Sequence, residues 1–210
     1  MVTPLSTQSN PPVRRRESTG QRRREILDAA LQLFLAQGIQ STTMPQICAA
    51  SGASTGSVYH LFGGKDEIAM TLYVEGMQNY EEMMLRSIEK KTSLKGCIRA
   101  LISTHMKHVV SDPPLSLYLA RLNIADCEGE LSHQYRELNN HFVDSIMSVL
   151  TPFVESGDLI RLPRELYFSI IIGPAAHLAR GWLCGRIKSD LVSATDRLAE
   201  AAWLSLATTT

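Results

Sequence analysis

The fold is decided by residues 42–65, with the sequence TTMPQICAASGASTGSVYHLFGGK. Its segment Thr43-Met44-Pro45-Gln46 has a capping-box pattern with proline in the first turn, which predicts the start of a short helix. Residues 51–54, Ser-Gly-Ala-Ser, predict a tight turn, and a second short helix is expected over residues 55–61. Two short helices joined by a glycine-containing turn predict a helix-turn-helix.

The second of these helices has two unlike sides. Its apolar side carries Val58, Leu61 and Phe62, which are expected to pack inward. The opposite side is small, rich in hydroxyl groups and nearly uncharged, with Thr55, Ser57, Tyr59 and His60. Such a surface fits the major groove of DNA, where it can meet base edges, thymine methyl groups and phosphates.

The chain outward from this stretch predicts an all-α fold. Leu27, Ala30, Leu31 and Phe34 recur at helical spacing before Gly38, which predicts a first helix over about 20–37. Longer helices are expected over about 65–90, 93–111, 114–125, 129–156, 163–187 and 190–206, and no alternating strand pattern is present in the sequence. We therefore expect an N-terminal three-helix DNA-binding domain followed by a larger helical bundle.

Three parts of the chain are expected. Residues 1–18 contain Pro4, Pro11 and Pro12 among many polar residues, which predicts a disordered arm. Residues 19–66 are expected to form the helix-turn-helix domain. Residues 67–210 are far more than DNA anchoring requires, so they are expected to form a regulatory and dimerisation domain that can hold a cavity.

Charge is divided unevenly between the two ends of the chain. The formal net charge is zero, with 21 basic and 21 acidic residues. Residues 1–65 carry seven basic and three acidic side chains, a net charge of +4, so the remainder is −4. A basic front and an acidic back favour binding of a polyanion by the N-terminal part.

Several classes of protein are excluded by composition. The longest apolar stretches are broken well before the length of a membrane-spanning helix, and no apolar segment follows the N-terminal arginines as in a secretory signal. The four cysteines, Cys48, Cys97, Cys127 and Cys184, form no Cys-x-x-Cys pair and are expected to be buried reduced thiols. A cytoplasmic protein is predicted, with no membrane partner and no metal or cofactor.

The stretch Gly52 to Lys65 has the spacing G-x-S-x-G-S-x-Y-x-x-F-x-x-K. With the preceding Thr42-Thr43-Met44, it resembles the signature of the tetracycline-repressor (TetR) family of bacterial transcription regulators. The resemblance covers about residues 20–68. It implies a dimeric regulator without enzyme activity, which binds a pseudo-palindromic DNA operator and is released by a small-molecule effector in its C-terminal bundle.

The same resemblance implies roles for individual residues. Thr43 is expected to cap its helix and touch a phosphate, and Lys65 to hold a phosphate from the start of the next helix. The residues expected to meet bases or backbone from the second helix are Thr55, Gly56, Ser57, Tyr59 and His60. Because Thr55 and Gly56 offer little bidentate contact to bases, sequence preference is expected to depend partly on DNA shape.

The C-terminal bundle contains polar and aromatic residues among its apolar helical faces. From that larger group, which also includes His105, His108, Asn139 and Arg180, the residues chosen as ligand contacts are Tyr118, Arg121, His177 and Trp182. A cavity in the middle of residues 65–187 is predicted around them. An arginine buried there would need a carboxylate or an anionic ligand.

The final two predicted helices are expected to form the dimer interface. Residues 170–183 are apolar nearly all round, which indicates burial on more than one side. The small residues expected at the interface in this segment are Gly173, Ala175, Ala176 and Ala179, and the family resemblance implies a four-helix interface.

Two other functions are compatible with the pattern. His105 and His108 are three residues apart on one predicted helix, with Asp112 one turn later, and this spacing can bind zinc in a helical metal-binding protein or enzyme. The other alternative is a helix-turn-helix protein that is controlled by a partner protein instead of a small ligand.

Overall fold

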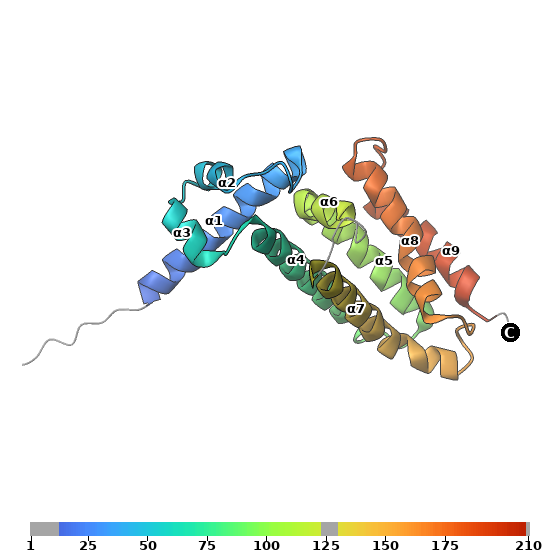
Figure 1. The fold of residues 1–210 in the computed structure, drawn as a ribbon. Coiled ribbons are helices and arrows are strands. Elements are labelled where there is room, and N and C mark those ends of the chain that lie inside the picture. Colours follow the sequence, from blue (N-terminus) through green and yellow to red (C-terminus); the bar gives the residue numbers. More distant parts are fainter. Residues whose placement is uncertain (1–12, 123–129, 209–210) are drawn as a thin grey trace, which may run out of the picture. The chain divides into compact units, whose positions relative to one another are not determined.

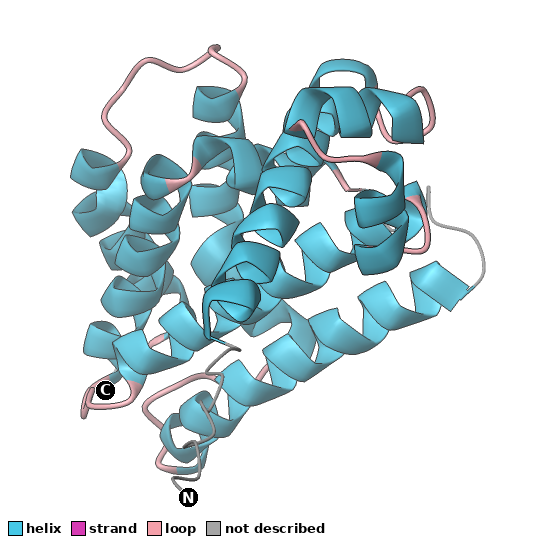
Figure 2. Ribbon diagram, turned by 90° about the vertical axis from the view of Figure 1, so that its left-hand side faces the viewer, coloured by secondary structure: helices cyan, strands magenta, loops and turns pink. Residues whose placement is uncertain are grey.

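The computed structural model describes residues 13–122 and 130–208, except for the side chains of residues 13–18 and 130–135. Helices joined by turns make up these ranges, which contain no strand beyond an isolated bridge between Leu159 and Ala207 (Figure 2). Across the same ranges, every helix is too short or too polar to cross a membrane. The chain divides into two compact units, Met1–Ala69 and Met70–Thr210.

The first unit contains α1 (Val13–Gln37), α2 (Met44–Ser51), α3 (Thr55–Leu61) and the first residues of α4 (Lys65–Ile88) (Figure 1). Its core is made of apolar side chains from all four helices: Ile26, Ala30, Phe34, Ile47, Val58, Phe62 and Ile68. The predicted helix-turn-helix is confirmed, with α2 and α3 as its two short helices.

Local hydrogen bonds set the ends of these short helices. Gln46 Oε1 accepts from the backbone N–H of Thr43 at 2.8 Å, which closes the predicted capping box. Gly52 ends α2 with φ of 64°, a left-handed conformation that favours glycine. Ser54 then caps α3, because its hydroxyl oxygen accepts from the N–H of Ser57 at 3.2 Å. The turn between the two helices is therefore specified residue by residue.

The first helix begins earlier than the sequence indicated. α1 starts at Val13, whereas the apolar spacing supported a start near residue 20. Residues 13–18, which were assigned to the disordered arm, are therefore helical. Arginine and glutamate, which make up four of these six residues, are good helix formers, so backbone propensity favours the extension of α1 to Val13. The rest of the expected arm, residues 1–12, lies outside the described residues.

The second unit is built around α5 (Leu94–Ser111). Its other helices are the remainder of α4, α6 (Pro113–Arg121), α7 (Glu130–Glu155), α8 (Arg164–Leu183) and α9 (Thr195–Leu206). α5 packs against α6, α8 and α9 (Figure 1). The buried side chains of α5 form the centre of the core: Cys97, Ile98, Leu101, Ile102 and Met106. α7 is joined to α4 through Ser145, whose hydroxyl donates to Glu81 at 2.8 Å.

Two predicted helices are shorter in the structure. α8 ends at Leu183 instead of residue 187, because Gly185 turns the chain with φ of 70° and the N–H groups of Arg186 and Ile187 donate to the carbonyl of Gly181. α9 begins at Thr195 instead of residue 190. Before it, the Asp190 carboxylate accepts from the N–H of Val192 and a short 3₁₀ turn follows. The end of the helix predicted over 114–125 reaches residues outside the described ranges.

The cysteines and the small residues of α8 differ in part from the expectation. Cys48, Cys97 and Cys184 are free thiols, but Cys184 is exposed because it follows the end of α8. Cys127 lies outside the described residues.

Ala175 and Ala179 are buried inside their own chain, against the core around α5, so their assignment to a dimer interface is wrong. At these two positions, the apolar surface of α8 is buried within its own subunit.

Candidate functional site

The outward side of α3 is the first candidate surface. Val58 is fully buried and Phe62 nearly so, which orients the helix. Thr55, Gly56, Tyr59 and His60 are exposed, while Ser57 is half-buried. Tyr59 is 51% exposed, an unusual position for a large aromatic ring in the middle of a helix. The exposed side carries a histidine but no lysine, arginine or carboxylate.

Lys65 connects the start of α4 to the loop before α2. Its ammonium group donates to the carbonyl oxygens of Gln40 at 2.9 Å and Thr42 at 3.2 Å. Thr43, next to this loop, is exposed, and its hydroxyl donates to Gln46 at 3.0 Å. The structure thus brings Lys65 close to the N-terminal end of α2. A helix N-terminus and an ammonium group together favour binding of an anion.

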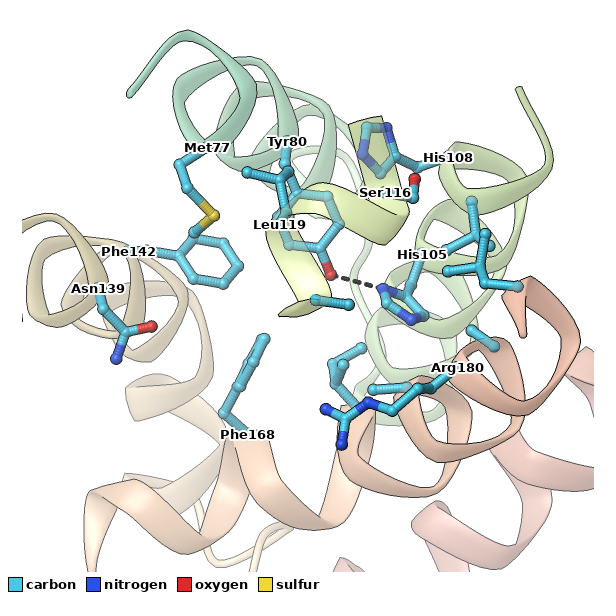
Figure 3. Close-up of a pocket in the computed structure, with 16 residues that line it drawn as sticks. Met77, Tyr80, His105, His108, Ser116, Leu119, Asn139, Phe142, Phe168 and Arg180 are labelled. Atoms are coloured by element: carbon cyan, nitrogen blue, oxygen red, sulfur yellow. Dashed lines mark hydrogen bonds between the residues drawn. The ribbon is translucent and has the colours of Figure 1, made fainter. Parts of the chain in front are cut away.

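The second unit contains a cavity of about 360 Å³ among α4, α5, α6, α7 and α8 (Figure 3). Its apolar lining consists of Met77, Val109, Leu119, Ala120, Phe142, Phe168, Ile172, Ala176, Ala179 and Leu183. Its polar lining consists of Tyr80, His105, His108, Ser116, Asn139 and Arg180. A mostly apolar cavity with a few polar groups is the usual form of a small-molecule site.

Aromatic contacts hold one wall of this cavity. The ring centroids of Tyr80 and Phe142 are 5.5 Å apart, and those of Phe142 and Phe168 are 5.1 Å apart in an edge-to-face arrangement. Gly76 lets α6 approach α4, because a Cβ there would lie only 3.3 Å from the side chains of Leu115 and Leu119. The cavity therefore has a packed wall where α4, α6 and α7 meet.

A cluster of buried polar groups from α4, α5 and α6 lines the cavity. The Tyr80 hydroxyl and His105 Nδ1 are 2.9 Å apart and hydrogen-bonded (Figure 3). The other ring nitrogen of His105, the Nε2 of His108 and the hydroxyl of Ser116 are buried and find no hydrogen-bond partner in the described residues. Each such group costs about 1–3 kcal/mol of stability. We call Tyr80, His105, His108 and Ser116 the polar cluster.

Burial keeps the two histidines uncharged at neutral pH. It lowers the pKa of His105 to about 4, and the neighbouring His108 lowers it further. Burial also lowers the pKa of His108, against the opposing effect of the Asp112 carboxylate. The pKa of the Tyr80 hydroxyl is raised by burial well above its usual range. The polar cluster is therefore a set of neutral hydrogen-bonding groups.

These shifts predict a loss of stability in mild acid. Both histidines have a lower pKa folded than the ordinary value of 6.5, so the unfolded chain binds more protons below that pH. Stability should be full above pH 6.5 and fall below it, by up to about 1.4 kcal/mol per pH unit down to about pH 4 from His105, and in the same direction from His108. Urea unfolding at several pH values will measure it. His105→Gln should reduce the slope, whereas Thr195→Val, at a buried polar position without a titratable group, should not; equal slopes would contradict the assignment.

Comparison with known proteins identifies the family. The family model for bacterial regulatory proteins of the tetR family matches residues 26–70, which include α2, α3 and Lys65. The regulator AcrR of Shigella flexneri is 31% identical over 175 residues, which are 80% of this chain and 78% of that protein. The chain belongs to the TetR family. It is a transcriptional regulator with a helix-turn-helix DNA-binding unit, as the sequence indicated.

Two further likenesses concern a regulator from Bacillus subtilis. The fatty acid metabolism regulator protein of strain 168 is 24% identical over 181 residues, 84% of this chain and 91% of that protein. The solved structure of FadR from B. subtilis in complex with stearoyl-CoA has a TM-score of 0.74 at 24% identity, over 85% of this chain and 96% of that chain. This second likeness shows that the TetR fold extends over the C-terminal bundle.

The four residues chosen from the sequence as ligand contacts do not line the cavity. Tyr118 is buried, Trp182 is half-buried against the core, and Arg121 and His177 are exposed. Helical periodicity showed that these residues interrupt apolar faces, but it did not show which face encloses empty space. The cavity is lined instead by four others of the larger group: His105, His108, Asn139 and Arg180.

Sequence reasoning missed Tyr80, Ser116 and Phe168 as cavity residues. Tyr80 could have been found, because it is a hydroxyl-bearing residue on the same stripe of α4 as Met77, Met84 and Ile88, all buried or half-buried. Ser116 had no comparable signal, since a serine in a short helix is usually a surface residue.

The zinc alternative finds no support in TetR relatives or in the geometry. Among the described residues, no three histidine, cysteine or carboxylate side chains are grouped to hold a metal. Asp112, the third residue of the predicted set, instead caps α6 by accepting from the N–H of Leu115 at 3.1 Å. His105 is engaged with Tyr80.

Proposed function

We propose that this TetR-family protein is a dimeric repressor that binds a pseudo-palindromic operator with α3 and is released by a small molecule in the cavity of the second unit. The observation that carries the proposal is the exposed, uncharged side of α3 with Tyr59 at its centre. Its place of action is the cytoplasm, where the operator lies, and no catalytic role is proposed.

The proposed DNA contacts are the residues implied by the family signature: Thr43, Thr55, Gly56, Ser57, Tyr59, His60 and Lys65. α3 enters the major groove, with Thr55 and Tyr59 toward base edges or the adjoining backbone. The N-terminus of α2 at Thr43 approaches a phosphate. Ser57 is half-buried and its N–H is held by Ser54, so its contribution is made through the hydroxyl alone.

Lys65 can donate hydrogen bonds both to the loop before α2 and to DNA. An ammonium group has three N–H donors, and the carbonyls of Gln40 and Thr42 take two of them. The third remains for a phosphate oxygen. The carbonyl contacts also place the charge at the start of α4, where the helix dipole alone would repel a cation.

Replacement of Lys65 by alanine tests this contact. Affinity should fall about equally for operator and scrambled DNA, because phosphates carry no sequence information. The slope of log K against log salt should flatten by ~0.9 per subunit for a lost phosphate contact. Fluorescence anisotropy at several salt concentrations will measure the slope, with Lys90→Ala, at an exposed position of the second unit, as the control. A weaker affinity with an unchanged slope would assign Lys65 to the loop alone.

The proposed dimer face lies on α8 and α9. Leu166, Gly173 and His177 are exposed at helical spacing on α8, and Ala201 and Leu204 are exposed on α9, which packs beside it. Leu204 is 67% exposed in the single chain. Exposed leucines next to small residues allow two copies to pack closely, and a two-fold operator requires a two-fold protein.

The effector is proposed to occupy the cavity described above. The B. subtilis regulator, whose solved structure is a complex with stearoyl-CoA, supports a response to a small ligand. For this chain we propose a response to a small ligand, and we do not propose that the ligand is stearoyl-CoA. A cavity of about 360 Å³ is at the lower end of the range for small-molecule sites.

Release from DNA is proposed to follow from a shift in subunit spacing. α4 begins in the first unit at Lys65 and contributes Met77 and Tyr80 to the cavity of the second. A ligand that binds one arrangement of the cavity walls more tightly would favour one separation of the two α3 helices. The half-sites would then no longer match successive major grooves.

Selection of bound sequences from random double-stranded DNA tests the proposal. Enrichment of an inverted repeat, with salt-dependent binding by the dimer, is the expected result. Failure to enrich any sequence would contradict a sequence-specific regulator. A thermal-shift screen with metabolites then tests the cavity, and the absence of any stabilising metabolite would favour control by a partner protein.

A further inference from the structure

The lining of the cavity is organised by polarity from its interior to its rim. Tyr80, His108 and Ser116 are each less than a tenth exposed, so they mark the interior. Asn139 and Arg180 are exposed, so they mark the rim. Figure 3 shows the Arg180 guanidinium directed toward the space between Phe168 and His105, with the Ser116 hydroxyl beside the His108 ring.

The interior offers hydrogen bonds that the protein itself does not use. His105 Nε2, His108 Nε2 and the Ser116 hydroxyl have no partner in the described residues, although all three residues line the cavity. Buried polar groups are nearly always paired in native proteins. Three unpaired groups in one lining therefore indicate that a bound molecule supplies the partners.

The tautomer assigned to His105 indicates which chemical group of a ligand fits. A phenol is a strong donor, so we assign the Tyr80 hydroxyl as the donor to His105 Nδ1, which leaves Nε2 with its proton and free to donate. An oxygen atom of the ligand accepts from that N–H. A hydroxyl group on the ligand would also fit the opposite tautomer, because it both donates and accepts.

That oxygen belongs to a neutral group. The described lining contains no acidic residue, its charged residue Arg180 is exposed at the rim, and the buried imidazoles are uncharged. A carboxylate placed there would be desolvated without a counter-charge, which is unfavourable. The positive charge of the lining is at the rim, on Arg180, which has no acidic partner in the described residues.

The middle of the cavity is apolar and sets the length of the ligand. Met77, Phe142, Phe168 and Ile172 line it. Since a volume of about 360 Å³ is at the lower end of the range for small-molecule sites, the apolar body of the ligand is a short chain or a small ring system.

We propose that the cavity selects an organic acid with an apolar body and a second, neutral oxygen function, with the carboxylate at Arg180 on the rim and the neutral oxygen at the polar cluster inside. The inference rests on the proposed function, since it names the class of effector for the same cavity. It distinguishes this chain's ligand from a simple fatty acid, whose buried methyl end would leave the polar cluster unpaired.

Calorimetric titration of the full chain with three probes tests the proposal: decanoate, 10-hydroxydecanoate and the methyl ester of 10-hydroxydecanoate. The hydroxy acid should bind about tenfold more tightly than decanoate, because its hydroxyl gains the unpaired partners. In a cavity that needs no polar partner the order would be reversed, since desolvation of the hydroxyl weakens binding. The proposal is therefore tested by which of the two acids, 10-hydroxydecanoate or decanoate, binds more tightly.

Variants test which side chains cause the preference for the hydroxy acid over decanoate. Ser116→Ala and His105→Phe should each reduce the preference for the hydroxy acid several-fold. Thr195→Val is the matched control, because Thr195 carries another buried unpaired hydroxyl that does not line the cavity. Arg180→Gln should weaken both acids about tenfold, preserve their ratio and leave the ester unchanged.

Three results would overturn the inference: equal or tighter binding of decanoate, a preference that survives both Ser116→Ala and His105→Phe, or no binding of any probe. Operator binding by the same preparation separates these failures from a failure of the proposed function. A chain that binds its operator but prefers decanoate remains a regulator with a different class of effector.

Discussion

Replacement of Leu204 by glutamate is expected to convert the protein from a dimer to a monomer. Leu204 is the most exposed of the large apolar side chains in the described residues, at 67%. Burying a leucine contributes about 1.5–3 kcal/mol, and a two-fold interface buries it twice. Two glutamates related by the same axis would instead bring carboxylates into the interface. Sedimentation velocity at micromolar concentration will measure the change.

The loss of the dimer should also remove operator binding, by about 10²–10⁴-fold, because each half-site would be bound independently. Val110→Glu is the matched control, since Val110 is 43% exposed on α5 and is not part of the proposed dimer face. It should remain a dimer. Ala175→Glu is expected to unfold the chain, because that position is fully buried within the subunit. A Leu204→Glu protein that sediments as the wild type would refute the proposed interface.

Gly56→Ala is expected to strengthen the fold and weaken DNA binding. A Cβ at Gly56 would meet no atom of the chain within 4 Å. Alanine in place of glycine within a helix stabilises it by about 0.5–1 kcal/mol. On the DNA, however, the added methyl group lies where α3 must approach the backbone closely. Operator affinity should fall by roughly 10- to 100-fold, the cost of overpacking a close interface.

Thermal unfolding and operator titration of the same protein measure the two effects. Gly20→Ala is the control, because Gly20 also lies in a helix with open space around it but outside the helix-turn-helix. It should gain stability without losing affinity. Wild-type operator binding by Gly56→Ala would show that α3 does not approach DNA at this position.

The helix-turn-helix could be predicted because its signals are local. The capping box at Thr43, the left-handed turn at Gly52 and the cap at Ser54 act over three or four residues. Their physical effects are hydrogen bonds to neighbouring N–H groups and a backbone conformation that only glycine adopts easily. The exposed positions of Thr55, Tyr59 and His60 follow from the burial of Val58 on the other side of one short helix.

The ends of the later helices were less predictable, because competing local interactions decide them. The carboxylate of Asp190 holds the next turn and delays α9 until Thr195. α1 extends to Val13 without an apolar stripe, since its arginines favour helix through backbone propensity alone. Apolar periodicity, the main sequence signal, indicates which side of a helix packs on the core. It does not predict where α1 and α9 begin.

By itself, the sequence determined the all-helical class, the helix-turn-helix and the family signature, because each depends on residues a few positions apart. The tertiary structure alone decided which side of α8 faces its own core and which residues enclose the cavity. Ala175 and Ala179 turn inward, and Tyr80, His105 and Arg180 reach the cavity from α4, α5 and α8. The polarity of that cavity depends on how separate helices pack, and helical spacing within a single helix carries no information about its neighbours.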